Sequence, residues 1–93
     1  MTDKNIESVA ELLKSISHPI RLKIICLIHD KEMTVKELRD EVETSTPNIT
    51  QHLTKLRYAG IISSRKEESF VINQISDDRI LKLLTSMKSL FCP

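Results

Sequence analysis

Apolar residues recur at helical spacing near both ends of the chain. Near the start, apolar positions three or four apart predict an amphipathic helix over residues 5–16. Near the end, Asp77 or Asp78 is expected to begin a helix over residues 78–91, with apolar positions at i, i+4, i+7 and i+11. The residues that set these two faces are Ile6, Val9, Leu13 and Ile16 in the first helix and Ile80, Leu84, Met87 and Phe91 in the last.

Three further helices are expected between them. Residues 19–29 are apolar almost all round, which is typical of a helix at the centre of a domain. Thr34 and Glu37 form a capping box that begins a short helix over residues 35–42. Ser45 or Thr46 is expected to cap the next helix, whose buried stripe is Ile49, Leu53 and Leu56.

The period of the apolar pattern changes after Gly60, the only glycine in the chain, which stands where a helix ends. Residues 61–65 and 70–75 then read as two strands joined by a charged tip at 66–69. The predicted order is four helices, a hairpin and a last helix. Residues 1–93 therefore form one domain, mostly α with a β-hairpin wing.

A short capped helix, a tight turn and a longer helix over residues 34–59 indicate a helix-turn-helix, and the hairpin over 61–75 makes it a winged one. The polar outer face of the second helix suits base edges, since Gln51 can pair bidentately with adenine. Arg65 and Lys66 on the wing are expected to reach the phosphate backbone. His52 lies beside the buried stripe, where packing is an equal alternative to DNA contact. The predicted DNA-binding residues are Thr46, Pro47, Asn48, Thr50, Gln51, His52, Lys55, Arg65 and Lys66.

The distribution of charge agrees with this reading, although the net charge is only +1. Residues 44–66 contain no acid, and four basic side chains lie among them (Lys55, Arg57, Arg65 and Lys66). A locally basic block of this kind suits a phosphate backbone. A chain of 93 residues also has a thin core, so oligomerisation is a natural supplement to its stability. Tyr58 is expected in the core or in an interface.

The runs that begin at His18-Pro19, at Ser45-Thr46-Pro47 and at Ala59-Gly60 resemble the ArsR/SmtB family of winged-helix repressors over roughly residues 6–92. This resemblance implies a homodimer joined through residues 5–16 and 78–91, and repression at an inverted repeat in double-stranded DNA. The wing departs from the family pattern. It has Glu67-Glu68 where a glycine is common, and Ile72-Asn73 where two tyrosines are common.

Many relatives in that family bind metals, but the usual ligands are missing here. The helix over residues 35–42 has no cysteine or histidine, and the last helix offers Asp77 and Asp78 without a histidine. A zinc site needs about four N, S or O ligands. No metal site or cofactor is therefore assigned, and a metal-responsive repressor with an unrecognised site is kept as an alternative.

Cys26 and Cys92 instead resemble the cysteine pair of a subgroup that responds to oxidants and reactive sulfur. That resemblance implies a switch in which oxidation or sulfur insertion links the two thiols and shifts the dimer. Thiolate is the reactive form, and Lys23 and His29 are placed to assist Cys26. A cysteine on an apolar helix is also commonly a packing residue, which is the competing interpretation of Cys26.

Other classes fit the sequence less well. It has no glycine-rich phosphate loop and no nucleophile elbow, so an enzyme is not expected. A winged-helix protein-interaction module is the alternative from another class, because fold does not fix function. The start of the chain lacks the basic and apolar pattern of a signal peptide, and no apolar run approaches a membrane span. A cytoplasmic protein that does not enter the membrane is the expectation, with both thiols reduced.

Overall fold

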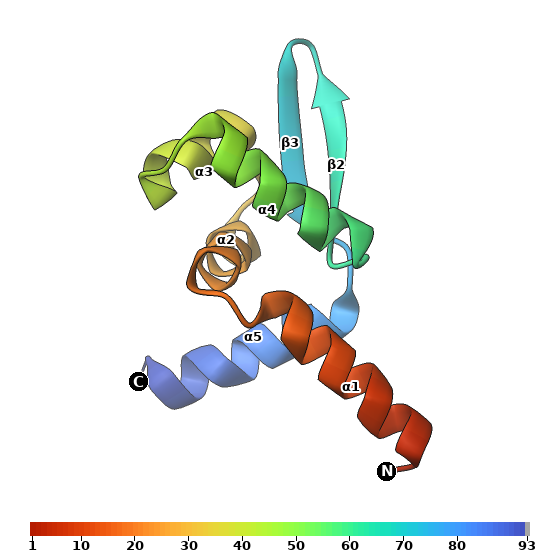
Figure 1. Ribbon diagram of the computed structural model, residues 1–93. Helices are drawn as coiled ribbons and strands as arrows, with labels where there is room; N and C mark the ends of the chain where they lie inside the picture. The colour runs from red at the N-terminus through yellow and green to blue at the C-terminus, as the bar shows by residue number, and fades with distance from the viewer. Residues whose placement is uncertain (93) are drawn as a thin grey trace.

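The computed structural model describes residues 1–92, and the final Pro93 lies outside the described residues. Within that range the chain forms five helices and three strands. The helices are α1 (Asp3–Ile16), α2 (Pro19–Asp30), α3 (Val35–Val42), α4 (Thr46–Tyr58) and α5 (Asp78–Phe91). The strands are β1 (Met33–Thr34), β2 (Ile62–Glu67) and β3 (Phe70–Ile75). The predicted winged helix-turn-helix order is confirmed (Figure 1).

Helix α2 lies at the centre of the domain, as its apolar sequence predicts. Its residues Ile24 and Ile25 are 0% exposed and Ile28 is 4% exposed. The helix contacts α3, α4, α5 and β3, so four other elements cover it. Figure 1 shows α1 and α5 on one side of α2 and the wing on the opposite side. The stripe of α4 predicted to be buried (Ile49, Leu53 and Leu56) closes the core from the wing side.

The caps predicted around the helix-turn-helix are present. The Thr34 hydroxyl accepts from the Glu37 backbone N–H at 3.1 Å, and the Glu37 carboxylate accepts from the Thr34 N–H at 3.0 Å. Of the two candidates for the α4 cap, Ser45 is the one that accepts from the Asn48 backbone N–H. Gly60 follows the last turn of α4 with a φ of +76°, a conformation that suits glycine. The N–H groups of Gly60 and Ile61 donate to the carbonyls of Arg57 and Leu56, which completes a Schellman end.

The wing differs from its prediction in two respects. The first strand runs over Ile62–Glu67 rather than 61–65, so Lys66 and Glu67 lie in the strand and not in the tip. Glu68 in the tip has a φ of +56°, the left-handed region that favours the glycine the sequence lacks there. The second difference is β1, which the sequence analysis missed. It pairs with β3, giving a three-stranded antiparallel sheet in the order β1-β3-β2.

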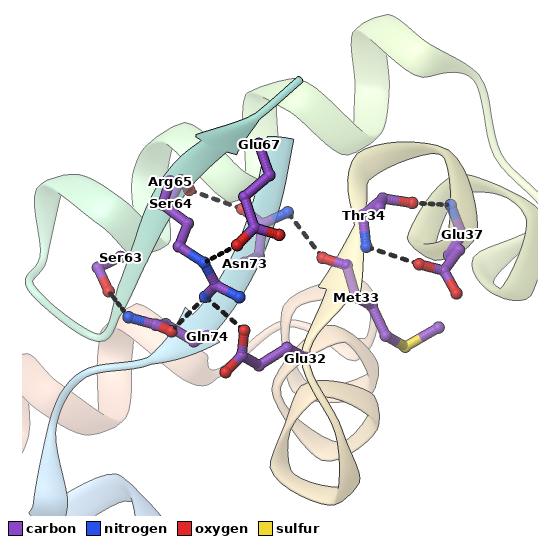
Figure 2. Close-up of polar contacts among 10 residues, drawn as sticks. All are labelled: Glu32, Met33, Thr34, Glu37, Ser63, Ser64, Arg65, Glu67, Asn73 and Gln74. Atoms are coloured by element: carbon purple, nitrogen blue, oxygen red, sulfur yellow. Dashed lines mark hydrogen bonds and ion pairs between the residues drawn. The ribbon is translucent and has the colours of Figure 1, made fainter. Parts of the chain in front are cut away.

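A buried amide fixes this sheet to the rest of the domain. Asn73 is 0% exposed and lies opposite Met33 in the β1–β3 pairing. Its amide donates to the Met33 carbonyl at 3.2 Å, and its oxygen accepts from the Ser64 hydroxyl at 2.7 Å (Figure 2). Because both ends of the amide are paired, its burial carries little cost.

The outer helices leave much apolar surface uncovered in the single chain. On α1, Ile6, Val9 and Leu13 are between 41% and 52% exposed, and of the predicted stripe only Ile16 is buried. On α5, Ile80 and Leu84 are buried, whereas Phe91 is 80% exposed. The last helix therefore packs on the core through its first turns and presents its end to the outside.

Two histidine rings join α2 to α4. His52 of α4 is 8% exposed, and its ring centroid lies 4.5 Å from that of His18 at the start of α2. The Nδ1 atom of His18 accepts from the Ile20 N–H at 3.1 Å and so caps α2. Burial lowers the pKa of His52, and the nearby charges of His18, Arg21 and Lys55 lower it further.

The burial of His52 against His18 predicts that the stability of the folded protein depends on pH. The unfolded chain holds a proton on histidine up to about pH 6.5, whereas folded His52 releases it at lower pH. The unfolded state therefore binds more protons in that window, and the stability that neutral His52 contributes is lost as the pH falls below about 6.5. Urea midpoints measured between about pH 8 and about pH 5.5 are expected to fall more steeply for the wild type than for His52→Gln. If the urea midpoint changes equally with pH in the wild type and in His52→Gln, His52 is not the source of the pH dependence.

Candidate functional site

The outer face of α4 carries exposed polar side chains, as the sequence predicts. Thr50, Gln51 and Lys55 are exposed, as is Pro47 in the first turn. The opposite face of the same helix is buried, so the core fixes which side chains face out. The arrangement offers short polar groups together with one cation along a rigid helix, which is the form in which proteins read a major groove.

The start of α4 is held by hydrogen bonds within the helix-turn-helix. The Thr46 hydroxyl accepts from Arg39 of α3 at 3.2 Å, and the half-buried Asn48 donates to the Thr44 hydroxyl at 2.8 Å. Arg39 also forms an ion pair with its neighbour Asp40. Arg39 was not singled out in the sequence, because nothing local indicates that its side chain crosses the turn. Its side chain adds a polar contact between α3 and the start of α4.

Two aromatic side chains of α4 narrow the alternatives that the sequence leaves open. The His52 ring is buried against His18, which favours packing, the alternative given beside DNA contact. Tyr58 is 96% exposed in the single chain, so it is outside the core of that chain, and its place in an interface stays a prediction. Tyr58 is the last residue of α4, so its side chain lies beyond the stripe that packs inward.

The two basic residues predicted on the wing have different surroundings. Arg65 forms ion pairs with Glu32 and with Glu67, and its Nη1 atom donates to Gln74 at 2.7 Å (Figure 2). The hydrogen bond to Glu32 contributes most to raising the pKa of Arg65, and the hydrogen bond to Glu67 raises it further. Lys66 is exposed, and none of the ion pairs among residues 1–92 involves it. Glu32 lies 33 positions before Arg65, and no local pattern pointed to this pairing.

A chain of hydrogen bonds joins α4 to the wing. The Nε atom of Arg57 donates to the Ser64 hydroxyl at 3.0 Å, and Ser64 donates to the buried Asn73. Asn73 in turn donates to the carbonyl of Met33, next to the cap of α3. Direct polar contacts therefore connect α4, the wing and β1, the strand that immediately precedes α3.

The two cysteines line one cavity of about 330 Å³ on the other side of the domain. Cys26 is half-buried on α2, and Cys92 is exposed immediately after α5; both are free thiols. The remaining walls are Leu22, Met87, Lys88 and Phe91. Both thiols therefore border the same cavity.

The charges around Cys26 differ from those predicted. Burial raises the pKa of the Cys26 thiol; Lys88 lowers it, whereas Asp30 and Cys92 raise it. Lys23, which was expected to assist, is exposed and is not among these charges. His29 is not among these charges either, and its Nδ1 lies 3.0 Å from the Lys88 Nζ. Lys88 is 62 positions from Cys26, so only the fold brings it near.

Residues 1–92 contain neither a cluster of metal-binding side chains nor a helix suited to cross a membrane. No group of three or more His, Cys, Asp or Glu side chains lies together in a way that would hold a metal ion. Over the same residues, no helix has the length and apolar character needed to cross a membrane.

Comparisons with known proteins agree with the fold and with a DNA-binding regulator. The model of the family described as "Bacterial regulatory protein, arsR family" matches residues 18–64. The biofilm growth-associated repressor of Agrobacterium fabrum is 32% identical over 90 residues, which is 97% of this chain and 77% of that protein. Reduced HlyU from Vibrio cholerae superposes with a TM-score of 0.94 at 32% identity, covering 98% of this chain and 96% of that one.

The transcriptional repressor BigR from Xylella fastidiosa has a TM-score of 0.87 at 30% identity, over 100% of this chain and 99% of that one. The family resemblance drawn from the sequence motifs is therefore confirmed, as is the winged-helix fold. The chain belongs to the arsR family of bacterial regulatory proteins and is a DNA-binding regulator of transcription.

Proposed function

We propose that the protein acts in the cytoplasm as a homodimeric repressor rather than an enzyme, and that linkage of Cys26 to Cys92 releases its operator. The observation that carries the switch is the single cavity lined by both thiols. The repressing direction is supported by the relatives from Agrobacterium and Xylella, both of which are named repressors.

The exposed apolar faces of the outer helices support the dimer. Ile6, Val9 and Leu13 on α1 and Leu90 and Phe91 at the end of α5 are all more than 40% exposed. Large apolar patches on a small domain mark interaction surfaces. A two-fold dimer places its two α4 helices about one helical turn of DNA apart, which requires an inverted-repeat operator.

Sequence readout is assigned to Thr50 and Gln51, and phosphate contact to Lys55, Lys66 and the start of α4. The exposed face of α4 supports both roles, because the helix is held by its buried stripe and its capped end. The backbone N–H groups at a helix N-terminus attract a phosphate. Arg65 has a smaller share, since Glu32 and Glu67 already neutralise it.

An organic trisulfide, RS–S–SR, can supply the sulfur that is inserted between the two cysteines. One cysteine thiolate attacks the central sulfur, forms a new S–S bond and expels one RS⁻. The second cysteine thiolate attacks the same sulfur and expels the other RS⁻, leaving Cys26 and Cys92 joined through one inserted sulfur. With diamide, two thiols transfer two hydrogens to the N=N bond and form a direct disulfide. A direct disulfide needs Cα atoms within about 7 Å, and the inserted sulfur relaxes that limit.

The base-reading role of Gln51 is tested by Gln51→Ala. Loss of a good base contact is expected to weaken binding to the specific operator by about 1–3 kcal/mol, or roughly 5- to 150-fold. Fluorescence anisotropy measures this on an operator selected in vitro with the wild-type protein. A scrambled duplex is the control, and its affinity is expected to stay the same because phosphate contacts remain. An equal loss on both duplexes would exclude a base contact.

The different surroundings of Lys66 and Arg65 predict different salt effects. Lys66→Ala is expected to reduce the slope of log K against log salt by about one unit, as loss of one phosphate contact does. Arg65→Ala, a matched loss of charge one position away, is expected to change the slope less, because Glu32 and Glu67 hold that guanidinium. A larger change of slope in Arg65→Ala than in Lys66→Ala would show that DNA displaces Glu32 and Glu67 from Arg65.

The thiol switch is tested by treating the reduced protein with diamide or polysulfide. Peptide mapping is expected to find Cys26 joined to Cys92 within one chain, and anisotropy is expected to show release of the operator. Cys26→Ser and Cys92→Ser are the controls, and both are expected to stay bound to DNA after treatment. A wild-type protein that forms no such crosslink, or that forms it and keeps its DNA, contradicts the proposal.

A further inference from the structure

We infer that Lys88 is the positioning residue of the thiol pair. Its ammonium supplies a positive charge to the half-buried Cys26 thiol. Its contacts with α2 hold the end of α5, which Cys92 follows. This assignment deepens the proposed thiol switch and rests on it. It names a residue that neither the sequence motifs nor the comparisons single out.

The first support is the way in which Lys88 is held. Its Nζ atom lies 2.7 Å from the Asp30 carboxylate and 3.0 Å from the Nδ1 atom of His29. Both partners belong to the last turn of α2, whereas Lys88 belongs to the last turns of α5. His29 also lies 3.5 Å from the Thr85 hydroxyl, one turn earlier on α5. The C-terminal ends of the two helices are therefore joined by the Lys88 ammonium together with the His29–Thr85 contact.

The second support is the position of Lys88 relative to both thiols. Its side chain is one wall of the cavity that Cys26 and Cys92 share. Cys92 follows Lys88 by one helical turn, and its backbone N–H donates to the Lys88 carbonyl at 2.8 Å. An ammonium has three donors, and His29 and Asp30 take two of them among residues 1–92. No hydrogen bond among these residues uses the third.

The charges around Cys26 give this geometry a chemical consequence. Burial, Asp30 and Cys92 all disfavour the thiolate of Cys26, and Lys88 opposes them. A thiol must ionise before it attacks sulfur. Without the ammonium, the two helix ends lose the ion pair to Asp30, and Cys26 keeps only the neighbours that oppose its ionisation. A purely structural Lys88 would hold α5 against α2 but would leave the ionisation of Cys26 unchanged.

The test follows Cys26 alone, in full-length protein carrying Cys92→Ser. The rate of alkylation by iodoacetamide is measured against pH with Lys88 present and with Lys88→Met. We expect the midpoint of the pH profile to move to higher pH in Lys88→Met, with alkylation several-fold slower near neutral pH. Lys82→Met, an exposed change on the same helix, is the matched control and is expected to keep the original profile.

Lys88→Arg separates charge from structure, because it keeps the cation and is expected to keep a midpoint below that of Lys88→Met. An unchanged midpoint in Lys88→Met, with circular dichroism showing folded protein, overturns the inference. So does a midpoint in Lys88→Arg as high as in Lys88→Met. The readout is independent of crosslinking, so a wild-type protein that never links its thiols would defeat the proposed switch without deciding the role of Lys88.

Discussion

The burial of the α2 isoleucines is the interaction on which the other elements depend. Ile24, Ile25 and Ile28 are at most 4% exposed, and full burial of one such side chain contributes about 1.5–3 kcal/mol. The other buried side chains of the core lie on the surrounding elements, and α3, α4, α5 and β3 all contact this central helix. Helix α4 and helix α5, which precedes Cys92, therefore pack against the same element.

Features set by neighbouring residues were predictable from the sequence. The Thr34–Glu37 box, the Ser45 or Thr46 cap and the end of α4 at Gly60 each depend on residues within one turn, and each is present. The central position of α2 and the inward stripe of α4 followed from apolar periodicity in the same way. Local signals of this kind fix helix identity and helix ends.

The remaining features depend on contacts between distant positions. The pairings Glu32–Arg65 and Asp30–Lys88 join residues 33 and 58 positions apart, and charged residues at such separations leave no pattern in a sequence. The two-residue strand β1 is too short for an alternation to show, and only the partner strand β3 defines it. His52 and Tyr58 lie beside the stripe and at its end, where periodicity decides least, and there the sequence left two alternatives open for each residue.

The ion pairs of Arg65 with Glu32 and Glu67 have a consequence for association with DNA. With that guanidinium neutralised by Glu32 and Glu67, and with Glu68 beside Lys66, the wing carries little charge of its own into solution. Long-range attraction to phosphate depends on such uncompensated charge, because it concentrates collisions in productive orientations. Under the proposed DNA-binding role, we expect the acid-free segment through α4 to guide the encounter. We expect the wing to contribute less to the rate of association than to the lifetime of the complex.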